Sequence, residues 1–450
     1  MTGRGRCAVV AGQDAEGRSG DDATSVFQSS VDAAVSSGVG SFDEVVTVNI
    51  APASGNSSSY AHHEAGAVRA RDLDAEWICF LGLGETLSPR AFELVSPAVQ
   101  SYDAVWGGVH TGNGEPGQKH VEGAGFSCQD TVSFFHAALH WGIGRTHFVR
   151  TDMALEAIGG IQATEAWYAD YLIRLWHRGE CLKSAQPYSS GEPGLFGLNE
   201  LEKSRLLDYI AENPLFISVD HKGKIAKLPY TGCNPTLERI QLRGLFYEAE
   251  DLAYVGERVA SGATIVDVGA NTGNHLVYFS LYMSPRRIIP IEPNPEAARV
   301  LKATIDANGI DGIDLGCIGK AAGAVHRRVS LKPQRRVQLG SVALEKEAGG
   351  EIEMVPLDDL IEGRVDFIKI DAEAMELDVL LGGRGIVDRD RPLILVEVQD
   401  ENLPDFLAVV ENFGYRVERI FPDQAYANYF LAPQQLSGNR AATTGPTGRK

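Results

Sequence analysis

The chain has 450 residues, which is enough for two or three domains, and its hydrophobic content of 44% is that of an ordinary globular protein. The formal net charge of −19 argues against a nucleic-acid backbone as partner and disfavours an anionic membrane surface. No segment approaches the ~20 consecutive apolar residues that a membrane helix needs, so we expect no membrane span.

The six cysteines are scattered along the chain, and none forms a C-x-x-C pair. This spacing argues against a zinc knuckle or a redox motif, so we predict no metal site. Several of these thiols lie within apolar runs, which indicates a reducing compartment. The apolar run after Arg6 is too short for a signal peptide, and we therefore expect a cytoplasmic protein.

In the first half, strands are predicted at 7–10, 44–50, 77–81 and 104–106, and helices at 23–37, at 62–71 and from a cap at Ser88-Pro89. The alternation of strands and helices predicts a layered α/β domain over residues 1–190. A stretch rich in Gly, Pro and Ser at 190–197 marks its end. A linker follows at 191–240, with a helix at 201–210 and a hairpin around Lys222-Gly223 that we expect to pack against the second domain.

The second half, residues 241–435, predicts another α/β domain, followed by a disordered tail at 436–450. Helices are predicted at 245–258, from His275, and at 295–307, 377–381 and 403–413. Strands are predicted at 264–267, 287–291, 313–318, 328–331, 365–371, 392–398, 415–420 and 428–431. Pro290 cannot donate to a strand ladder, so in a central strand we expect a bulge or a short strand there.

A glycine loop connects the strand that ends at Asp267 to the helix that begins at His275. Gly269 and Gly273 lie in this loop, where residues without a Cβ let backbone approach a ligand closely. The amide groups at the helix start attract a carboxylate or a phosphate. The spacing is neither that of a dinucleotide site nor that of a P-loop, and fits a class I S-adenosylmethionine methyltransferase better.

A second signal is the acid Glu292, at the tip of the next predicted strand and roughly 20 residues beyond the glycine loop. Its two carboxylate oxygens can accept hydrogen bonds from both hydroxyls of a ribose. The two signals, in this order, predict a nucleoside cofactor.

The second half resembles the FkbM family of methyltransferases from about Tyr247 to Leu431. The resemblance is carried by Tyr247-Glu248, Asp267-Val268-Gly269-Ala270-Asn271-Thr272-Gly273-Asn274, Glu292-Pro293-Asn294, Leu357-Asp358-Asp359-Leu360, Ile368-Lys369-Ile370-Asp371-Ala372-Glu373, Glu376, and Arg391-Pro392 with Glu397. It implies a Rossmann-like sheet, S-adenosylmethionine as cofactor, and usually O-methylation of a small molecule or a sugar hydroxyl. The family usually has Gly where this chain has Ala374.

In this interpretation, Asp267 lies near the methionine amino end of the cofactor, and Glu292 holds the ribose. Gly269 and Gly273 give backbone access, Asn271 bonds a polar group of the cofactor, and Tyr247 with Glu248 closes over it. The expected cofactor-binding residues are Glu248, Asp267, Gly269, Ala270, Asn271, Gly273, Asn274, Glu292 and Pro293.

Deprotonation of a weakly acidic hydroxyl needs a positioned base. The candidates are Asp371 and Glu373, followed by His275. The alternatives are that Asp371 and Glu373 fix the loop or cap the next helix, and that His275 only bonds at its helix start. For Lys369 we favour a structural ion pair. Glu397 either supports the site or is solvated at a strand end.

The first half is similar, more faintly, to a family 2 glycosyltransferase domain of the GT-A type. The strand at 77–81 with Ser88-Pro89 matches the strand that normally ends in a D-x-D metal site, but here those positions read Gly82, Gly84 and Glu85. The uridine-contacting acid falls near Asn49, and the expected Glu-Asp pair near Trp167-Tyr168. A lone Glu85 is a poor ligand set for a divalent cation, so the resemblance implies a degenerate transferase.

The predicted fold class is thus α/β with two domains, one GT-A-like and one a Rossmann-like class I methyltransferase domain. The favoured function is methylation of a sugar, glycan or glycosylated metabolite whose acceptor the front domain holds. A bifunctional glycosyl- and methyltransferase, and a non-catalytic binding or scaffold protein, remain as alternatives. We expect no nucleic-acid partner, and the oligomeric state stays open.

Overall fold

The computed structural model describes residues 5–11, 20–48, 50, 59–82, 85–111, 120–122, 127–191, 197–332, 344–345, 350–423 and 425–434. The chain divides into two compact units, Met1–Leu215 with Tyr230–Gly232, and Phe216–Pro229 with Cys233–Lys450. We call them the N-terminal and the C-terminal unit. The predicted tail at 436–450 and the expected position of Asn49 lie outside the described residues. Among the helices that the structure describes, none has the length and apolarity to cross a membrane.

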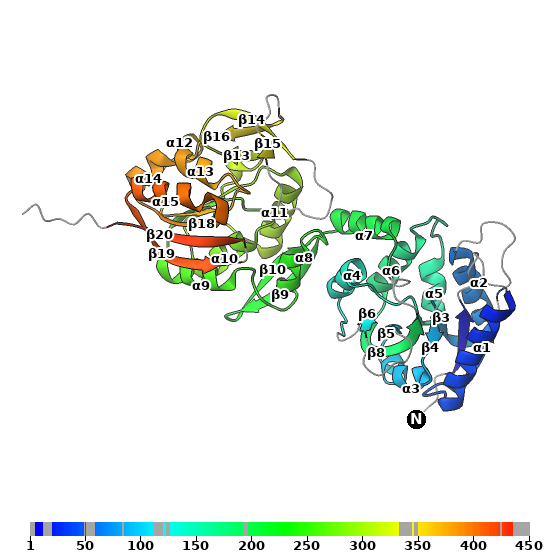
Figure 1. Ribbon diagram of the computed structural model, residues 1–450. Coiled ribbons are helices and arrows are strands. Elements are labelled where there is room, and N and C mark those ends of the chain that lie inside the picture. Colours follow the sequence, from blue (N-terminus) through cyan, green and yellow to red (C-terminus); the bar gives the residue numbers. More distant parts are fainter. Residues whose placement is uncertain are drawn as a thin grey trace, which may run out of the picture. The chain divides into compact units, whose positions relative to one another are not determined.

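The N-terminal unit is built on a mixed sheet with the strand order β2-β1-β3-β7-β5-β8-β4, in which β6 pairs with β5 (Figure 1). The strands are β1 (Arg6–Ala11), β2 (Glu44–Val48), β3 (Ala75–Leu81), β4 (Thr86–Leu87), β5 (Ala104–Thr111), β6 (His120–Glu122), β7 (His147–Arg150) and β8 (Cys181–Gly191). Strands β1, β2 and β3 are parallel, whereas β7 runs antiparallel between β3 and β5.

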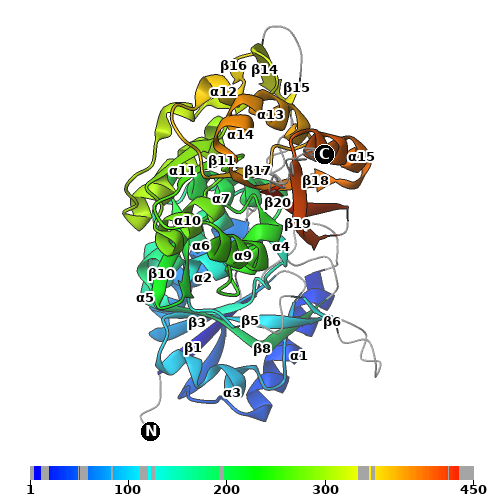
Figure 2. The same cartoon turned by 90° about the vertical axis from the view of Figure 1, so that its left-hand side faces the viewer.

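Helices cover both faces of this sheet. They are α1 (Gly20–Ser37), α2 (Ser59–Asp72), α3 (Ala91–Val95), α4 (Thr131–His140), α5 (Thr151–Ile158), α6 (Trp167–Arg178) and α7 (Glu200–Glu212), with a 3-10 turn η1 (Ala98–Gln100). Figure 2 shows α1 and α3 on one side of the strands and α2 and α5 on the other. The layered α/β architecture predicted for this half is therefore present.

Several elements of the N-terminal unit differ from the prediction. The sequence analysis predicted none of β7, α4, α5, α6 and β8, although the apolar residues of α6 recur at helical spacing. Helix α3 starts later than predicted, and its N-cap residue Arg90 makes no side-chain cap hydrogen bond, so the expected cap at Ser88-Pro89 is wrong. Strand β8 continues to Gly191, two residues into the stretch at 190–197 where we placed the boundary.

The C-terminal unit is built on a six-stranded sheet with the order β12-β11-β17-β18-β20-β19. The strands are β11 (Thr264–Val268), β12 (Arg287–Ile291), β17 (Phe367–Ile370), β18 (Leu393–Gln399), β19 (Tyr415–Pro422) and β20 (Tyr426–Pro433). The first four strands are parallel, and β20 is antiparallel to both β18 and β19. The chain order reverses between β11 and β17, and in open α/β sheets such a switch point opens a crevice at the carboxyl ends of the strands.

The helices of this unit also cover two faces of the sheet. They are α8 (Pro235–Gln241), α9 (Ala249–Arg258), α10 (Asn274–Met283), α11 (Pro295–Asn308), α12 (Leu357–Leu360), α13 (Glu376–Gly382), α14 (Arg384–Asp390) and α15 (Leu403–Asn412), with 3-10 turns η2 (Leu315–Cys317) and η3 (Asp400–Asn402). Figure 1 shows α9 and α10 on one side of the strands and α13, α14 and α15 on the other. Buried Val, Ile and Phe side chains on the second side form the main core.

Two small sheets complete the C-terminal unit. Strands β13 (Lys320–Ala322), β14 (Arg327–Leu331), β15 (Leu344–Glu345) and β16 (Ile352–Val355) form one sheet. The predicted hairpin is present as β9 (Leu215–His221) and β10 (Lys224–Tyr230), with Lys222 and Gly223 both at positive φ. The Lys224 ammonium donates to the carbonyl of Leu281 in α10, which holds the hairpin on this unit.

Pro290 required a bulge or a short strand only if β12 were central, and this expectation is wrong. Strand β12 is the edge of the six-stranded sheet and pairs with β11 without a register shift. On its other side, within the described part of the chain, it forms two isolated bridges, Ile288 with Ile313 and Glu292 with Ile318. Pro290 lies between these two bridges. The segment opposite Pro290 forms the 3-10 turn η2 and not the strand predicted at 313–318. The proline therefore removes no ladder bond.

The helix predicted at 245–258 begins only at Ala249. Its N-cap residue Glu248 has a φ of 56°, a left-handed conformation that a continuing helix cannot contain. Residues 245–248 therefore form a turn ahead of the helix, and this turn brings Tyr247 and Glu248 into the site described next.

Candidate active site

The glycine loop after β11 passes directly against the loop after β17. Gly269 has a φ of 71°, and a Cβ added to it would lie 1.7 Å from the carbonyl oxygen of Asp371. Gly273 has a φ of 102°, and a Cβ there would lie 2.9 Å from the Leu301 side chain. Only glycine combines this backbone conformation with so close an approach, which explains both glycines of the motif.

Glu292 follows β12 at the same edge of the sheet. Its side chain is buried, and its two oxygens accept hydrogen bonds from the backbone amides of Asn271 and Asn294, each at 2.8 Å. Burial raises the pKa of Glu292 to about 7, although these two amides oppose the shift. Each carboxylate oxygen has a second lone pair, so Glu292 can still accept hydrogen bonds from a ligand.

A cavity lies at these strand ends, between Glu292 and the loop after β17. Its lining consists of Val268, Gly269, Asn271, Ile291, Glu292, Pro293, Asn294, Ala321, Ala322, Asp371, Ala372, Glu373 and Met375. The structure thus gathers on one cavity Gly269, Asn271, Glu292 and Pro293, and it adds Asp371 and Glu373. Ala270 and Gly273 belong to the same loop but do not line the cavity.

Asp267 does not line the cavity and is fully buried. Its nearest cation is Lys369, whose Nζ is 3.7 Å from Oδ1, and neither oxygen accepts a hydrogen bond from the described residues. Lys369 donates to the carbonyl of Gly269 at 2.9 Å and to Asp371 at 3.2 Å. Burial opposes the charged form of Lys369, but the two carboxylates hold its pKa above the usual value. The predicted structural ion pair of Lys369 is therefore present.

Asp371 and Glu373 follow β17, but neither caps helix α13. The loop is fixed by Glu376, which accepts hydrogen bonds from the amides of Ala372 and Ala374, each at 3.1 Å. Glu373 and Ala374 both have positive φ, 48° and 70°. The loop geometry typical of glycine is thus adopted here by alanine. No described residue donates a hydrogen bond to the Glu373 carboxylate, and burial together with Asp371 raises its pKa to about 7.

His275 is the centre of a second buried polar group. Its Nε2 lies 2.8 Å from Glu248, and the Asn428 amide donates to Glu248 and to Asp251, each at 2.9 Å. Burial alone would raise the pKa of Glu248, but the hydrogen bond and charge of His275 lower it below the ordinary value. The structure therefore gives the His275 ring a carboxylate partner, and the predicted bond of the ring at its own helix start is not seen among the described residues. Glu248, expected on the cofactor, does not line the cavity.

The turn at Tyr247 is held by Asn274. The Asn274 side chain accepts from the Tyr247 amide at 3.2 Å and donates to its carbonyl at 3.1 Å. The Tyr247 hydroxyl then lies 3.0 Å from the hydroxyl of Tyr426, at the start of β20. Asn274, expected to bind cofactor, is thus used to position Tyr247 and Glu248 at the strand ends.

Glu397 was named in the sequence only as a supporting or solvated acid. In the register of the sheet it pairs with Asn428 on β20, and it follows Val396, the partner of Ile370. Glu397 therefore lies beside Asp371. Burial, followed by the charges of Asp371, Glu248 and Glu373, raises its pKa to about 9. The alternative that Glu397 is simply a solvated acid at the end of a strand is therefore excluded.

Asn428, Tyr426 and Asp251 are members of the site that sequence reasoning missed. Asn428 and Tyr426 lie far along the chain, on a strand antiparallel to its neighbours, so no motif spacing indicates them. Asp251 follows Glu248 by three residues, a spacing that would place both acids on one face of the helix predicted at 245–258. That spacing was the one available signal.

In the N-terminal unit, Glu85 occupies the place where the glycosyltransferase resemblance expected a metal site. Its carboxylate accepts hydrogen bonds from the amide of Arg145 and the hydroxyl of Ser189. A Cβ on Gly82 would lie 2.2 Å from Glu85, so no space is left on that side. Trp167 and Tyr168, where the Glu-Asp pair was expected, are buried in an aromatic cluster with His63 and Tyr171. Gly84 lies outside the described residues.

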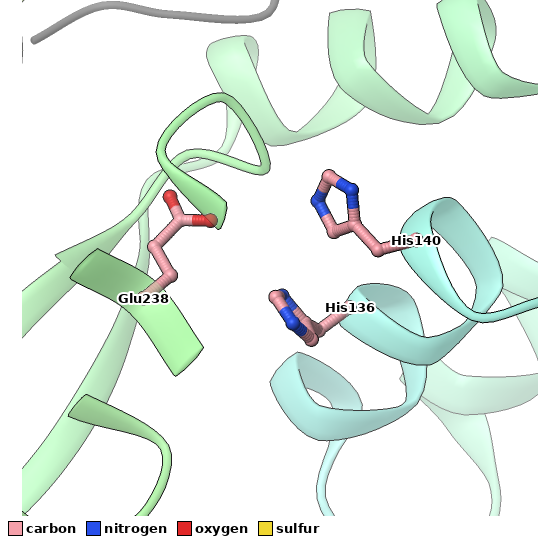
Figure 3. A group of neighbouring side chains, drawn as sticks. All are labelled: His136, His140 and Glu238. Atoms are coloured by element: carbon pink, nitrogen blue, oxygen red, sulfur yellow. The ribbon is translucent and has the colours of Figure 1, made fainter. Parts of the chain in front are cut away.

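Helix α4 carries His136 and His140 one turn apart, and Figure 3 shows both imidazoles on the same side of it. Their ring centroids are 4.7 Å apart. Glu238 on α8, which the figure also labels, belongs to the C-terminal unit, so the three residues are not a site of either unit.

The strand order, the glycine loop and the acid after β12 define the C-terminal unit as a Rossmann-like α/β domain with a crevice at its switch point. The family model of the methyltransferase FkbM domain matches residues 267–417. The C-terminal unit therefore contains a methyltransferase FkbM domain, which confirms the predicted resemblance over these residues. The model reaches no residue of the N-terminal unit, and the glycosyltransferase resemblance stays a prediction. No curated protein matched the chain.

Solved structures were also compared with the chain. Methyltransferase FkbM from Methylobacillus flagellatus KT is 17% identical, with a TM-score of 0.29, over 51% of this chain and 59% of that one. The ribosomal protein L11 methylase from Lactobacillus delbrueckii subsp. bulgaricus is 14% identical, with a TM-score of 0.29, over 43% of this chain and 83% of that one. We draw no conclusion about function from likenesses at this level.

Proposed function

We propose that the C-terminal unit is an S-adenosylmethionine-dependent methyltransferase that methylates a hydroxyl group of a sugar, glycan or glycosylated metabolite. The observation that supports this most is a single cavity bordered by Gly269, Glu292 and Glu373, within the segment that matches the FkbM domain. The first two residues suit a nucleoside, and the third suits proton removal from an acceptor.

The residues present fit S-adenosylmethionine. Glu292 has free lone pairs for the two ribose hydroxyls, and the missing side chain of Gly269 leaves room for close backbone contact. Asp267 does not line the cavity, and its nearest ammonium group is that of Lys369 at 3.7 Å, so the fit rests on Glu292 and Gly269. When bound, the cofactor supplies an electrophilic methyl group and a thioether leaving group.

The chain itself aligns the acceptor and removes its proton. The acceptor oxygen forms the new bond to the methyl carbon, the sulfur–carbon bond breaks with its electron pair on sulfur, and the hydroxyl proton passes to a base. Of the three predicted bases, Asp371 is engaged by Lys369 and His275 by Glu248. Glu373 lines the cavity with a pKa of about 7, which suits a general base. We therefore assign Glu373 as the base.

The acceptor class is supported by the side chains around the strand ends. The hydroxyls of Tyr247 and Tyr426 face each other there and can bond the hydroxyl groups of a polyol. Lys369, the buried cation of this region, is already occupied by Asp371 and a backbone carbonyl. An uncharged acceptor suits these groups better than a phosphorylated one.

The N-terminal unit we propose to be a degenerate GT-A-like module that contributes to acceptor binding and does not catalyse glycosyl transfer. The support is that Glu85 already accepts two hydrogen bonds from its own unit and is buried. Manganese-dependent binding of a nucleotide sugar would instead revive the bifunctional alternative.

The experiment compares the wild-type protein with Glu373→Gln. We expect Glu373→Gln to bind S-adenosylmethionine in calorimetry, and to transfer labelled methyl from it to a panel of mono- and oligosaccharides at least about 100-fold more slowly than wild type. Equal transfer rates would show that Glu373 is not the base. Absence of cofactor binding in the wild-type protein would contradict the methyltransferase proposal and favour the non-catalytic alternative.

A further inference from the structure

Four carboxyl groups from three segments converge at the ends of β17 and β18, and we call them the acid cluster: Glu248, Asp371, Glu373 and Glu397. Asp371 and Glu373 line the cavity that Glu292 borders. Glu397 lies beside Asp371 in the sheet register, and Glu248 precedes α9. The acid cluster is therefore part of the cavity's surroundings and is not spread over the surface.

Few positive charges balance these acids. Lys369 is shared between Asp371, Asp267 and a carbonyl, and His275 bonds Glu248. The other titratable groups that face the cluster, from β11, β12, α9, α13, β20 and the turn before α9, are Asp267, Glu292, Asp251, Glu376, Tyr426 and Tyr247. All of these are acids or phenols, so the surroundings are short of positive charge.

The lack of positive charge around the acid cluster changes the pKa values of its members in the ligand-free protein. Burial and mutual repulsion raise the pKa of Glu373 to about 7 and that of Glu397 to about 9. Acids with such values keep a proton near neutral pH until a cation enters their surroundings. Asp267 adds two fully buried oxygens without a hydrogen-bond donor among the described residues.

We propose that the acid cluster recognises the positive charge of the cofactor, so that this domain binds the sulfonium S-adenosylmethionine more tightly than its neutral thioether product, S-adenosylhomocysteine. The inference rests on the proposed function, because it assumes that this cavity is the cofactor site. Both molecules share the adenosine and the amino-acid end, so Glu292 and the glycine loop treat them alike. The charge at sulfur is what the cluster distinguishes.

Methyl transfer itself removes this charge. The methyl carbon leaves with the bond to the acceptor oxygen, the sulfur keeps the electron pair and becomes neutral, and the acceptor proton goes to Glu373. Attraction between the cluster and the cofactor is lost at that step. The spent product therefore leaves the site more readily than the substrate form does.

Calorimetry with S-adenosylmethionine and S-adenosylhomocysteine on the full-length protein tests the proposal. At pH 8 we expect S-adenosylmethionine to bind at least about 10-fold more tightly, because one unit charge meets several partly buried carboxylates. We also expect it to release protons on binding, seen as different heats in two buffers of unlike ionisation enthalpy. S-adenosylhomocysteine releases fewer protons.

Glu397→Gln and Glu373→Gln remove one ionisable group each and keep the side-chain shape. Each is expected to lower the preference for S-adenosylmethionine about 5-fold and to reduce the proton release. Glu411→Gln, an exposed acid on α15, makes the same change in net charge and leaves both quantities as in wild type. Thermal melting confirms that each variant is folded.

Equal affinities for the two molecules, or a preference unchanged in both cluster variants, would overturn the inference while leaving the methyltransferase proposal intact. Failure of both molecules to bind the wild-type protein overturns the two proposals together. These outcomes are distinguishable in one titration series.

Discussion

Each unit of this chain has a buried glutamate just beyond the end of a strand, and the two glutamates are used differently. Glu85 follows β3 and Glu292 follows β12, and each is 6% exposed. Each also accepts two hydrogen bonds from its own unit. What separates them is the space beside the carboxylate, because Glu292 borders a cavity and Glu85 packs against Gly82.

The comparison teaches that an acid at a strand end does not by itself indicate a ligand site. The same residue type, burial and hydrogen-bond count serve packing in one unit and a cavity in the other. The deciding feature is what lies on the remaining side of the carboxylate, because backbone amides bond both acids but a cavity borders Glu292 whereas Gly82 packs against Glu85. Substitutions at the loop and at the two acids therefore test the comparison directly.

Gly269→Ala is expected to have the largest effect. The new Cβ would lie 1.7 Å from the carbonyl of Asp371, and the backbone has a φ of 71°. We expect a loss of at least about 3 kcal/mol in unfolding free energy and of S-adenosylmethionine affinity, measured by denaturant unfolding and calorimetry.

Gly262→Ala is the matched control for Gly269→Ala, because Gly262 has a φ of 79° and no atom within 4 Å of an added Cβ. Gly262→Ala introduces backbone strain without a steric clash. It should destabilise the protein by about 1 kcal/mol and leave the affinity for S-adenosylmethionine unchanged. If both alanine variants behave alike, close approach to Asp371 is not what Gly269 provides.

The paired variants Glu292→Ala and Glu85→Ala come next. We expect Glu292→Ala to weaken S-adenosylmethionine binding about 30-fold, since two charged hydrogen bonds to ribose are lost. Glu85→Ala leaves the amide of Arg145 without its acceptor and should destabilise the protein by about 2 kcal/mol, with cofactor affinity unchanged. Calorimetry and chemical unfolding separate the two results. Unchanged cofactor affinity in Glu292→Ala would remove the distinction between the two acids.

Glu397→Gln should have a smaller effect that depends on pH. An acid whose pKa is raised in the folded state, here to about 9, destabilises the folded state most when the pH exceeds that value. Its destabilising contribution is absent below about pH 4.5 and grows as pH rises toward 9. We expect Glu397→Gln to raise the Tm of the ligand-free protein by about 3 °C at pH 9 and to change it little at pH 4. A Tm shift of the same size at both pH values would exclude titration of Glu397 as its cause.

The sequence predicted the part of the site that is continuous along the chain. The loop from Asp267 to His275 and the acid at Glu292 were identified because a strand, a glycine turn and a helix follow one another within a few residues. The sequence did not show which strands pair with one another, or in which register. The sheet register places Glu397 beside Asp371, and it places Asn428 where its amide donates to both Glu248 and Asp251. Register depends on packing between strands, which a single sequence does not show.

Regularity of the apolar period does not separate the predicted elements from the missed ones, because α6 is strongly amphipathic and was missed, whereas α2 is weakly amphipathic and was predicted. The hairpin at Lys222-Gly223 was found from its turn residues, whereas β7 and α4 to α6 were missed in a half rich in buried aromatic side chains. The strand that contains Pro290 was expected to be central, but the described segment on its other side forms isolated bridges and no strand, so the strand lies at the edge of the sheet. Local chemistry thus indicated the cofactor loop, and tertiary pairing decided the rest.

Ala374→Gly is expected to have the smallest effect, and its sign is the informative part. Ala374 is exposed and has a φ of 70°, which strains any residue with a Cβ, and the FkbM family usually has glycine there. Glycine relieves about 1–2 kcal/mol of strain and adds up to about 1 kcal/mol of unfolded-state entropy, so we expect a net stabilisation of about 0.5–1 kcal/mol by urea unfolding.

Ala408→Gly, at an exposed position within α15, is the control for Ala374→Gly, and its effect on stability is expected to have the opposite sign. Glycine relieves no strain there and should destabilise the protein by about 1 kcal/mol. Opposite signs for the two variants would show that Glu376, which holds the amides of Ala372 and Ala374, maintains this loop conformation at the expense of backbone strain. If both variants were destabilised equally, the loop would have to relax away from positive φ in solution, and the position of Glu373 on the cavity would depend on ligand binding.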